Sequence, residues 1–317
     1  MASNGNDVSE EVQEEVLEDH EEGEDEADIS KKLLKKLTNS LLKRATIETK
    51  VADIVSASPI PDNVNLSNAT RYYNMNHEKR GVALIFNHYK FDADRMPMRK
   101  GTDEDKERLI KAFKKHAFRV HFEDDLCISD IKYVINREIV KVDHSKSDCV
   151  AIAIMTHGSE GDKIYAKDSA YCLHDLVSML TADKCPTLAG KPKLFFIQAC
   201  RGEGQDGGHT IRTDSPRSGQ YTQFRIPNQA DFFLAYSTIP GYVAMRNQLY
   251  GSWFVKELCK KLMEDDSHAR SIFQLMTEVV GKVAIDYETK GDHYKQIPTF
   301  TSRLTKDLVF GKKAKSQ

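Results

Sequence analysis

Apolar residues fall into two alternating patterns from about Tyr72 onward. Short runs that are apolar at nearly every position predict strands covered on both faces, as in a parallel sheet. Longer stretches with apolar residues on one helical face predict amphipathic helices between the strands. The expected strands are 81–86, 120–122, 149–155, 193–198, 231–236 and 297–302, and the expected helices are 102–117, 128–140, 252–263 and 270–285. This alternation predicts an α/β fold: a single domain with a mostly parallel central sheet and helices on both faces.

The helix expected at 102–117 has a clear start signal. Thr102 is the predicted N-cap, and Asp103, Glu104 and Asp105 follow in the first turn. Acidic side chains are favourable there because they complement the positive end of the helix dipole.

Residues 1–69 lack the globular pattern. Residues 1–28 carry many acidic side chains and no Lys or Arg, so we expect a disordered acidic leader. Residues 29–69 comprise a basic, leucine-rich segment and then a linker. The leucines of the basic segment share one helical face beside the lysines, and the linker has Ser-Pro and Ile-Pro-Asp turn signals. Two interpretations of the basic helix stay open: it binds a membrane surface or a partner, or it pairs with the acidic leader of its own chain.

Composition narrows the class of protein. The 317 residues include 46 basic and 48 acidic side chains, for a formal net charge of −2, so no global field favours nucleic acid or a membrane surface. No apolar run approaches the ~20 residues of a membrane span, and the N-terminus does not resemble a secretory leader. The six cysteines are scattered without a C-x-x-C pair. We therefore expect a soluble, cytoplasmic protein with no metal, no cofactor, no nucleic-acid partner and no membrane span.

Reactive residues follow two of the buried strands. Strand 149–155 is followed by Thr-His-Gly at 156–158, and strand 193–198 runs into Gln-Ala-Cys-Arg-Gly at 198–202. Because sites form at the carboxyl ends of parallel strands, we expect His157 to lie within reach of Cys200. A thiol beside an imidazole is a nucleophile with its base. Gly158 and Gly202 permit tight turns whose backbone N–H groups can face a developing oxyanion.

The pentapeptide at 198–202, with Thr-His-Gly upstream, is a caspase signature. Over about residues 70–311 the chain resembles a caspase of the executioner, or effector, type with a short leader. Further matching segments are 99–103, 191–195, 230–232, 240–242, 245–247 and 251–254. The resemblance implies a single caspase-like domain, made from a large and a small subunit after cleavage. It also implies a cysteine endopeptidase that cleaves proteins after aspartate and executes apoptosis once its zymogen is processed.

The resemblance assigns roles to the residues at the strand ends. Cys200 is the expected nucleophile and His157 the acid and base, while the N–H groups of Gly158 and Cys200 form the oxyanion hole. The carbonyl of Pro97 stands where the family often orients the imidazole.

The pocket for the P1 side chain maps to Arg99, Gln198 and Arg246. Two guanidinium groups and an amide suit a compact carboxylate. An uncharged P1 side chain would leave two arginines unpaired in a confined site.

The outer subsites depart from the family pattern. Met245 stands where the family commonly has Trp, so we expect a looser P2 wall, also lined by Tyr242. Asn247 and Trp253 are compatible with Asp at P4, but the loop 288–296, which helps to shape that region, is shorter than in many executioners.

Exposed aspartates suggest how the zymogen is activated. Gly202 to Gln223 is glycine-rich and almost without apolar residues, so we expect a long functional or cleavable loop. Cleavage after Asp214 in this loop would yield a large subunit, 70–214, and a small one, 215–317, and cleavage after Asp28 would release the leader. Asp53 is a further candidate. By resemblance the partners are protein substrates with P1 Asp, an upstream activating caspase, and a second copy of the cleaved unit.

Three alternative interpretations conflict with residues in the sequence. A relative with a basic P1 preference, like a paracaspase or legumain, would require acidic residues in the pocket where Arg99 and Arg246 stand. A catalytically silent caspase-like scaffold usually lacks the nucleophile or the base, and both are present. A zinc-binding regulator lacks the ligand spacing.

Overall fold

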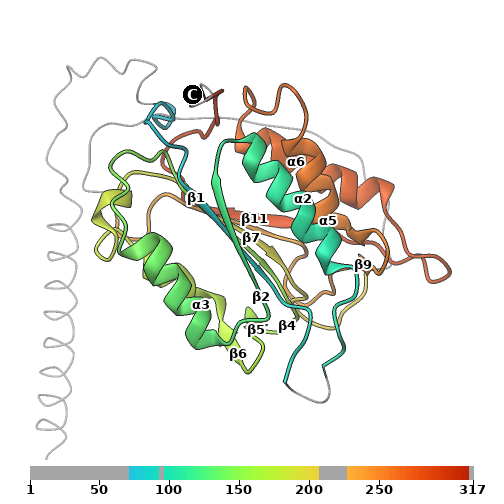
Figure 1. The fold of residues 1–317 in the computed structure, drawn as a ribbon. Coiled ribbons are helices and arrows are strands. Elements are labelled where there is room, and N and C mark those ends of the chain that lie inside the picture. The colour runs from blue at the N-terminus through green and yellow to red at the C-terminus, as the bar shows by residue number, and fades with distance from the viewer. Residues whose placement is uncertain (1–70, 93–95, 207–226, 314–317) are drawn as a thin grey trace, which may run out of the picture. The chain divides into compact units, whose positions relative to one another are not determined.

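The computed structural model describes residues 71–92, 96–206 and 227–313. Their centre is a six-stranded sheet of order β11-β8-β7-β3-β1-β2 (Figure 1). Its strands are β1 (Val82–Asn87), β2 (Arg119–Asp124), β3 (Val150–Met155), β7 (Lys193–Gln198), β8 (Phe232–Tyr236) and β11 (Thr299–Ser302). All neighbours pair in parallel except β11, which is antiparallel to β8. The mostly parallel sheet predicted from the apolar runs is confirmed.

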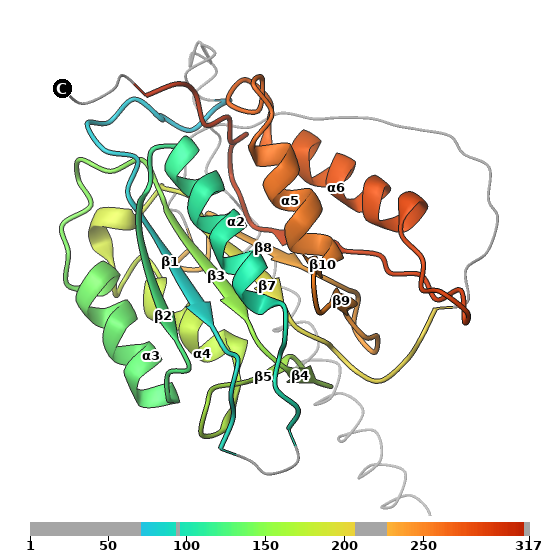
Figure 2. The same ribbon diagram turned by 45° about the vertical axis from the view of Figure 1, so that its right-hand side comes forward.

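Helices cover both faces of the sheet, as Figure 2 shows. One face packs against α2 (Thr102–Lys115), α5 (Trp253–Leu262) and α6 (Ile272–Asp286). The other packs against α3 (Ile128–Ile135), α4 (Leu173–Val177) and the short turns η2 (Asn136–Val140), η3 (Ser178–Leu180) and η4 (Pro186–Leu188). Alternate residues of β1 pack into the two hydrophobic cores. Ala83 and Ile85 belong to the core under α2, α5 and α6, and Leu84 and Phe86 belong to the core under α3 and α4. Strands buried on both faces explain why nearly every position in them is apolar.

Two small sheets were not predicted. One is β4 (Gly158–Ser159), β5 (Lys163–Tyr165) and β6 (Ala170–Cys172), and the other is the hairpin of β9 (Arg246–Asn247) and β10 (Gly251–Ser252). Strands of two or three residues are too short to show an alternating pattern in sequence.

The prediction that Thr102 is the N-cap of the helix was wrong. Gly101, with φ of 84°, is the N-cap residue, and Thr102 is the first residue of α2. The Thr102 hydroxyl is buried and serves other groups, since it donates to the Asn87 side chain and accepts a hydrogen bond from Arg99.

The helix expected at 128–140 also differs. Its α-helical part ends at Ile135, and residues 136–140 form a π-helical turn. The acidic leader 1–28, the basic segment and linker 29–69, and Asp28, Asp53 and Asp214 lie outside the described residues.

Candidate active site

The two strands that precede the predicted catalytic residues are direct neighbours. β3 and β7 pair in parallel, with Met155 opposite Gln198. The Thr156 amide continues this ladder and donates to the Gln198 carbonyl at 3.0 Å. His157 and Cys200 each follow these paired residues by two positions, so both leave the sheet at the same edge.

The ring of His157 is held by two contacts. Its Nε2 atom lies 2.8 Å from the Pro97 carbonyl oxygen, and its ring centre lies 4.9 Å from that of Phe91. A carbonyl oxygen only accepts, so Nε2 carries the hydrogen and Nδ1 of the neutral ring is a free base. Burial lowers the pKa of His157, the charges of Arg99 and Arg246 lower it further, and the bond to Pro97 opposes them. The imidazole is therefore neutral at pH 7 and able to accept a proton.

The thiol of Cys200 contacts the segment that follows β8. The Ala244 amide donates to Cys200 Sγ at 3.4 Å. None of the hydrogen bonds among the described residues joins Cys200 to His157. Nucleophile–base hydrogen bonds are often loose without substrate and tighten in the reacting complex.

Gly158 lies against the backbone of the nucleophile. A Cβ at this position would lie 2.1 Å from the Cys200 carbonyl oxygen, closer than any side chain can approach. Only glycine fits at this backbone contact. The two backbone segments predicted to form the oxyanion hole are thus in direct contact.

The loop after Cys200 is bonded to the loop that leads to Arg246. Arg201 N–H donates to the Tyr242 carbonyl at 2.9 Å, and Gly204 N–H donates to the Gly241 carbonyl at 2.8 Å. Gly202 has φ of 154°, and a Cβ there would lie 2.4 Å from Gly241 backbone atoms. The nucleophile loop and the predicted substrate-binding loop therefore share one backbone framework.

Arg99 is a buried cation with open donors. Only 1% of the residue is exposed, and its Nη1 donates to the His88 carbonyl and to the Thr102 hydroxyl, each at 2.9 Å. Its Nε and Nη2 atoms are buried without a hydrogen-bond partner among the described residues. Burial lowers the pKa of Arg99 to about 9, and the charge of Arg246 contributes to that shift. Unpaired buried donors of this kind are costly, and a carboxylate would satisfy them.

The other two predicted P1 residues lie on β9 and at the end of β7. Arg246 is on β9, and its Nε donates to the Lys100 carbonyl at 3.0 Å. Its pKa is lowered by burial. Gln198 is the last residue of β7, and its buried Oε1 has no partner in the described part of the chain.

The predicted outer subsite residues are tied together through two residues that the sequence did not single out. The Met245 amide donates to Gln296 Oε1 at 2.6 Å, and the Trp253 amide donates to the Met245 carbonyl at 3.4 Å. The Trp253 ring lies 5.3 Å from that of Tyr287. Gln296 ends the loop 288–296, and Tyr287 directly precedes it, so the loop length was the only sequence signal for either.

A family model described as "Caspase domain" matches residues 80–309. The chain belongs to the caspase family. Caspase-1 of Spodoptera frugiperda is 46% identical over 248 residues, which make up 76% of this chain and 82% of that protein. Caspase drICE of Drosophila melanogaster is 43% identical over 249 residues, or 76% and 73% of the two chains. The crystal structure of caspase-1 from Spodoptera frugiperda matches with a TM-score of 0.72 at 43% identity, covering 82% of this chain and 100% of that one.

Membership in the family confirms the predicted fold and activity. The chain is an aspartate-directed cysteine protease of the effector type, which acts in apoptosis and is made as a zymogen that cleavage activates. As a caspase it acts on protein substrates and assembles from a large and a small subunit. No helix in the described part of the chain is long and apolar enough to cross a membrane.

Proposed function

We propose that Cys200 and His157 carry out the peptide-bond cleavage of this caspase. His157 Nδ1 accepts the thiol proton, and the thiolate attacks the carbonyl carbon of the P1 residue. The N–H groups of Gly158 and Cys200 donate to the resulting oxyanion. The imidazolium returns its proton to the leaving amine, which departs and leaves a thioester. Water, deprotonated by His157, then hydrolyses the thioester and regenerates the thiol.

The specificity for aspartate rests on Arg99 and Arg246, with Gln198. The observation that supports this most directly is the pair of open donors on the buried Arg99 guanidinium. The mutual repulsion of two arginines makes a negatively charged ligand favourable there. An Asn side chain has nearly the shape of Asp but leaves both charges unneutralised, so the pocket should reject it strongly.

The outer subsites are assigned to residues around β9. Tyr242 and Met245 line the P2 site, and Asn247 and Trp253 line the P4 site. This assignment is supported by the backbone link from Trp253 to Met245 and by the ring contact between Trp253 and Tyr287. A flexible thioether at the P2 wall admits larger side chains than a rigid indole would.

Activation proceeds by cleavage after Asp214, which divides the domain into residues 70–214 and 215–317, and cleavage after Asp28 removes the leader. β7 and β8, on opposite sides of Asp214, are paired through the ladder from Lys193–Phe232 to Ile197–Tyr236. The contact of Arg246 with Lys100 also joins the two pieces. Cleavage would therefore leave the pocket assembled. Replacing Asp214 with Ala should block the separation into two pieces in a denaturing gel, and complete processing of that variant would refute the assignment.

The partners and location follow from this activity. We infer that an upstream caspase makes the activating cut and that two cleaved units associate through β11, the edge strand of the sheet. The cytoplasm is the inferred location. In support of it, all six cysteines are free, as is usual in a reducing compartment.

The function is tested with fluorogenic tetrapeptides that differ only in a P1 residue of Asp, Asn or Arg. The processed chain should turn over the Asp peptide alone, and Cys200→Ala should abolish turnover. Cleavage of the Arg peptide would overturn the pocket assignment. Processed chain without any turnover would instead indicate a silent scaffold.

A further inference from the structure

The β9–β10 hairpin is short, although several residues proposed to bind substrate lie on it or directly beside it. Its strands are two residues each, with Asn247 opposite Gly251 and Arg246 opposite Ser252, and Trp253 follows directly. An isolated two-stranded hairpin is marginally stable at best, so contacts outside it must fix the position of Arg246.

The strongest of these contacts is made by Asp105 in the first turn of α2. Its carboxylate is fully buried and accepts the Ser252 N–H at 3.0 Å from each oxygen and the Ser252 hydroxyl at 2.7 Å. A Cβ on Gly251, whose φ is 76°, would lie 2.2 Å from Asp105 Oδ1. Glycine at 251 is thus what allows the carboxylate to reach the hairpin backbone.

Further contacts join the same two elements. Arg108 Nη1 donates to the Tyr250 carbonyl at 2.9 Å, and Arg246 Nε donates to the Lys100 carbonyl. Gly101 lies so close to the hairpin that a Cβ on it would be 2.5 Å from the Asn247 carbonyl oxygen. In both ribbon views the hairpin lies beside the starts of α2 and α5 (Figures 1 and 2).

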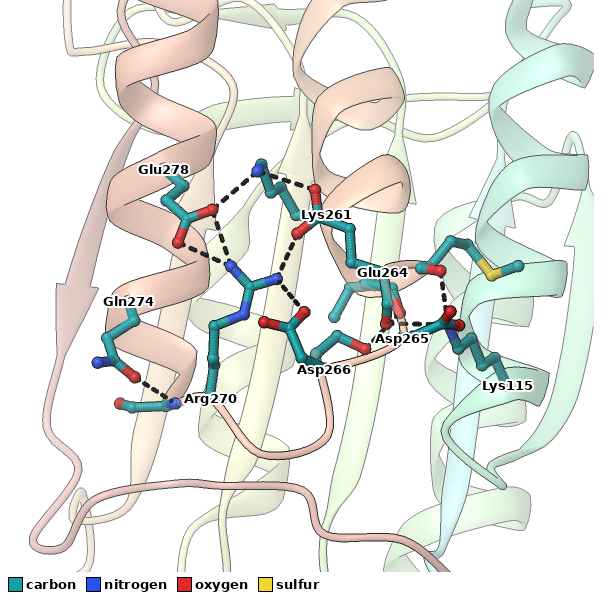
Figure 3. A network of polar contacts seen from close by, with 12 residues as sticks. Lys115, Lys261, Glu264, Asp265, Asp266, Arg270, Gln274 and Glu278 are labelled. Atoms are coloured by element: carbon teal, nitrogen blue, oxygen red, sulfur yellow. Dashed lines mark hydrogen bonds and ion pairs between the residues drawn. The ribbon is translucent and has the colours of Figure 1, made fainter.

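The opposite end of α2 is fixed separately. Lys115 donates to the carbonyls of Met263 and Glu264, at the edge of the ion-pair network in which Arg270 pairs with Glu264 and Glu278 (Figure 3). The carboxyl end of α2 is therefore anchored at the carboxyl end of α5 independently of Asp105. Loss of the Asp105 contact should free the hairpin without releasing the helix.

Three arginines and a buried thiol face the Asp105 carboxylate. Arg108 Nη1 lies 3.5 Å from Oδ1, and the carboxylate also interacts with the charges of Arg99 and Arg246. The Cys259 thiol stays neutral, because burial and the charge of Asp105 raise its pKa. Burial raises its pKa to about 6, against the hydrogen bonds from Ser252 and the nearby arginines. The carboxylate is thus mostly ionised at pH 7, where charge-assisted bonds to Ser252 are strongest.

We propose that Asp105 is a positioning residue that holds the β9–β10 hairpin through Ser252 and so aligns Arg246 and Trp253 with Arg99. This inference rests on the proposed roles of those three residues in substrate binding. It predicts that the contact sets substrate affinity rather than the reactivity of the nucleophile. Cys200 and His157 follow β7 and β3, which pair with each other in the central sheet, and the loop after Cys200 is bonded to Gly241 and Tyr242, which precede the hairpin.

The test compares Asp105→Ala and Asp105→Asn in the processed full chain. Asn can still accept the Ser252 N–H and donate to the hydroxyl, whereas Ala leaves both unpaired. Asp105→Ala should raise KM for the Asp tetrapeptide about tenfold with kcat changed less than about threefold, and Asp105→Asn should restore KM to within about threefold of the wild type. The rate of Cys200 alkylation by iodoacetamide should be the same in all. Asp103→Ala is the matched control, because Asp103 lies in the same helical turn with its side chain 71% exposed.

Each outcome decides the proposal. An unchanged KM in Asp105→Ala would overturn the proposal. An equal rise of KM in Asp105→Asn would also overturn it, because the rise would then come from the lost charge and not from the lost hydrogen bonds. If Asp105→Ala does not fold, Ser252→Ala is used instead, because it removes the hydrogen bond from the Ser252 hydroxyl to Asp105. An unchanged KM in Ser252→Ala would also overturn the proposal. Failure of the wild type to cleave the Asp peptide would refute the proposed function instead.

Discussion

The carbonyl oxygen of Pro97 lies 2.8 Å from Nε2 of His157. This contact fixes the tautomer of the proposed base, because Nε2 must carry the hydrogen that the carbonyl accepts. Nδ1 is then the atom available to the thiol. The orienting group is a backbone carbonyl without charge, so the contact holds the ring while adding no ionised partner that would strongly raise its pKa.

The activity of the enzyme should fall with pH below 6.5. His157 has a lowered pKa, so its neutral, proton-accepting form persists below the ordinary value, and protonation at lower pH removes the base. A profile of kcat/KM against pH in a processed enzyme should show this acidic limb. His157→Gln should lower kcat by about 10²–10⁴-fold and abolish the limb. An acidic midpoint above 6.5 would contradict the lowered pKa.

Arg99 should not tolerate replacement by lysine. A lysine would lose the planar fork that bonds the His88 carbonyl and Thr102 while presenting two further donors. We expect Arg99→Lys to reduce kcat/KM for the Asp peptide by on the order of 10²–10⁴-fold. Steady-state kinetics measures this, with Arg119→Lys on the exposed edge strand β2 as the control. Activity within tenfold of the wild type would mean that a point charge suffices in the pocket.

The central sheet could be predicted because its physical cause is local. Strands covered on both faces are apolar at nearly every position, and that pattern can be recognised within the strand itself. The Thr102 cap failed for the opposite reason. Its hydroxyl bonds to Asn87 and Arg99, groups that are brought to it only by the folded sheet and loop.

The sequence predicts that the strands before His157 and Cys200 end on the same side of the sheet, because the apolar runs indicate parallel strands. The direct pairing of β3 with β7 agrees with that expectation. Asp105 could not be distinguished from the other acids of a helix start, because the role inferred for it depends on Ser252, which lies 147 residues away. The contact of Gln296 could not be predicted for the same reason, because Gln296 accepts a hydrogen bond from Met245, which lies 51 residues away.

Met245→Trp should narrow the P2 site. A rigid indole would replace a flexible thioether on the wall, while the backbone bond from residue 245 to Gln296 would stay available. We expect the ratio of kcat/KM for P2 Ala over P2 Phe to rise about tenfold, since steric discrimination in apolar pockets is commonly of this order. Two tetrapeptides that differ only at P2 measure the ratio. Met263→Trp, at an exposed position after α5, should leave it unchanged.

The stability of the folded chain should depend on pH through Asp105. The direction of that dependence shows whether burial, which raises the pKa of Asp105, outweighs the hydrogen bonds from Ser252, which lower it. Its folded pKa of about 6 exceeds the ordinary 3.8, so between these values the folded chain binds a proton that the unfolded chain lacks. Stability from this group is therefore present at low pH and is lost as pH rises through about 6. Between pH 7.5 and pH 5 the wild type should gain about 1.4 kcal/mol relative to Asp105→Asn, one pKa unit of linkage. Urea unfolding of Cys200→Ala protein at the two pH values measures this, because the other titrating groups are common to both chains. A relative loss at pH 5 would mean that the bonds from Ser252 outweigh burial and hold the folded pKa below 3.8.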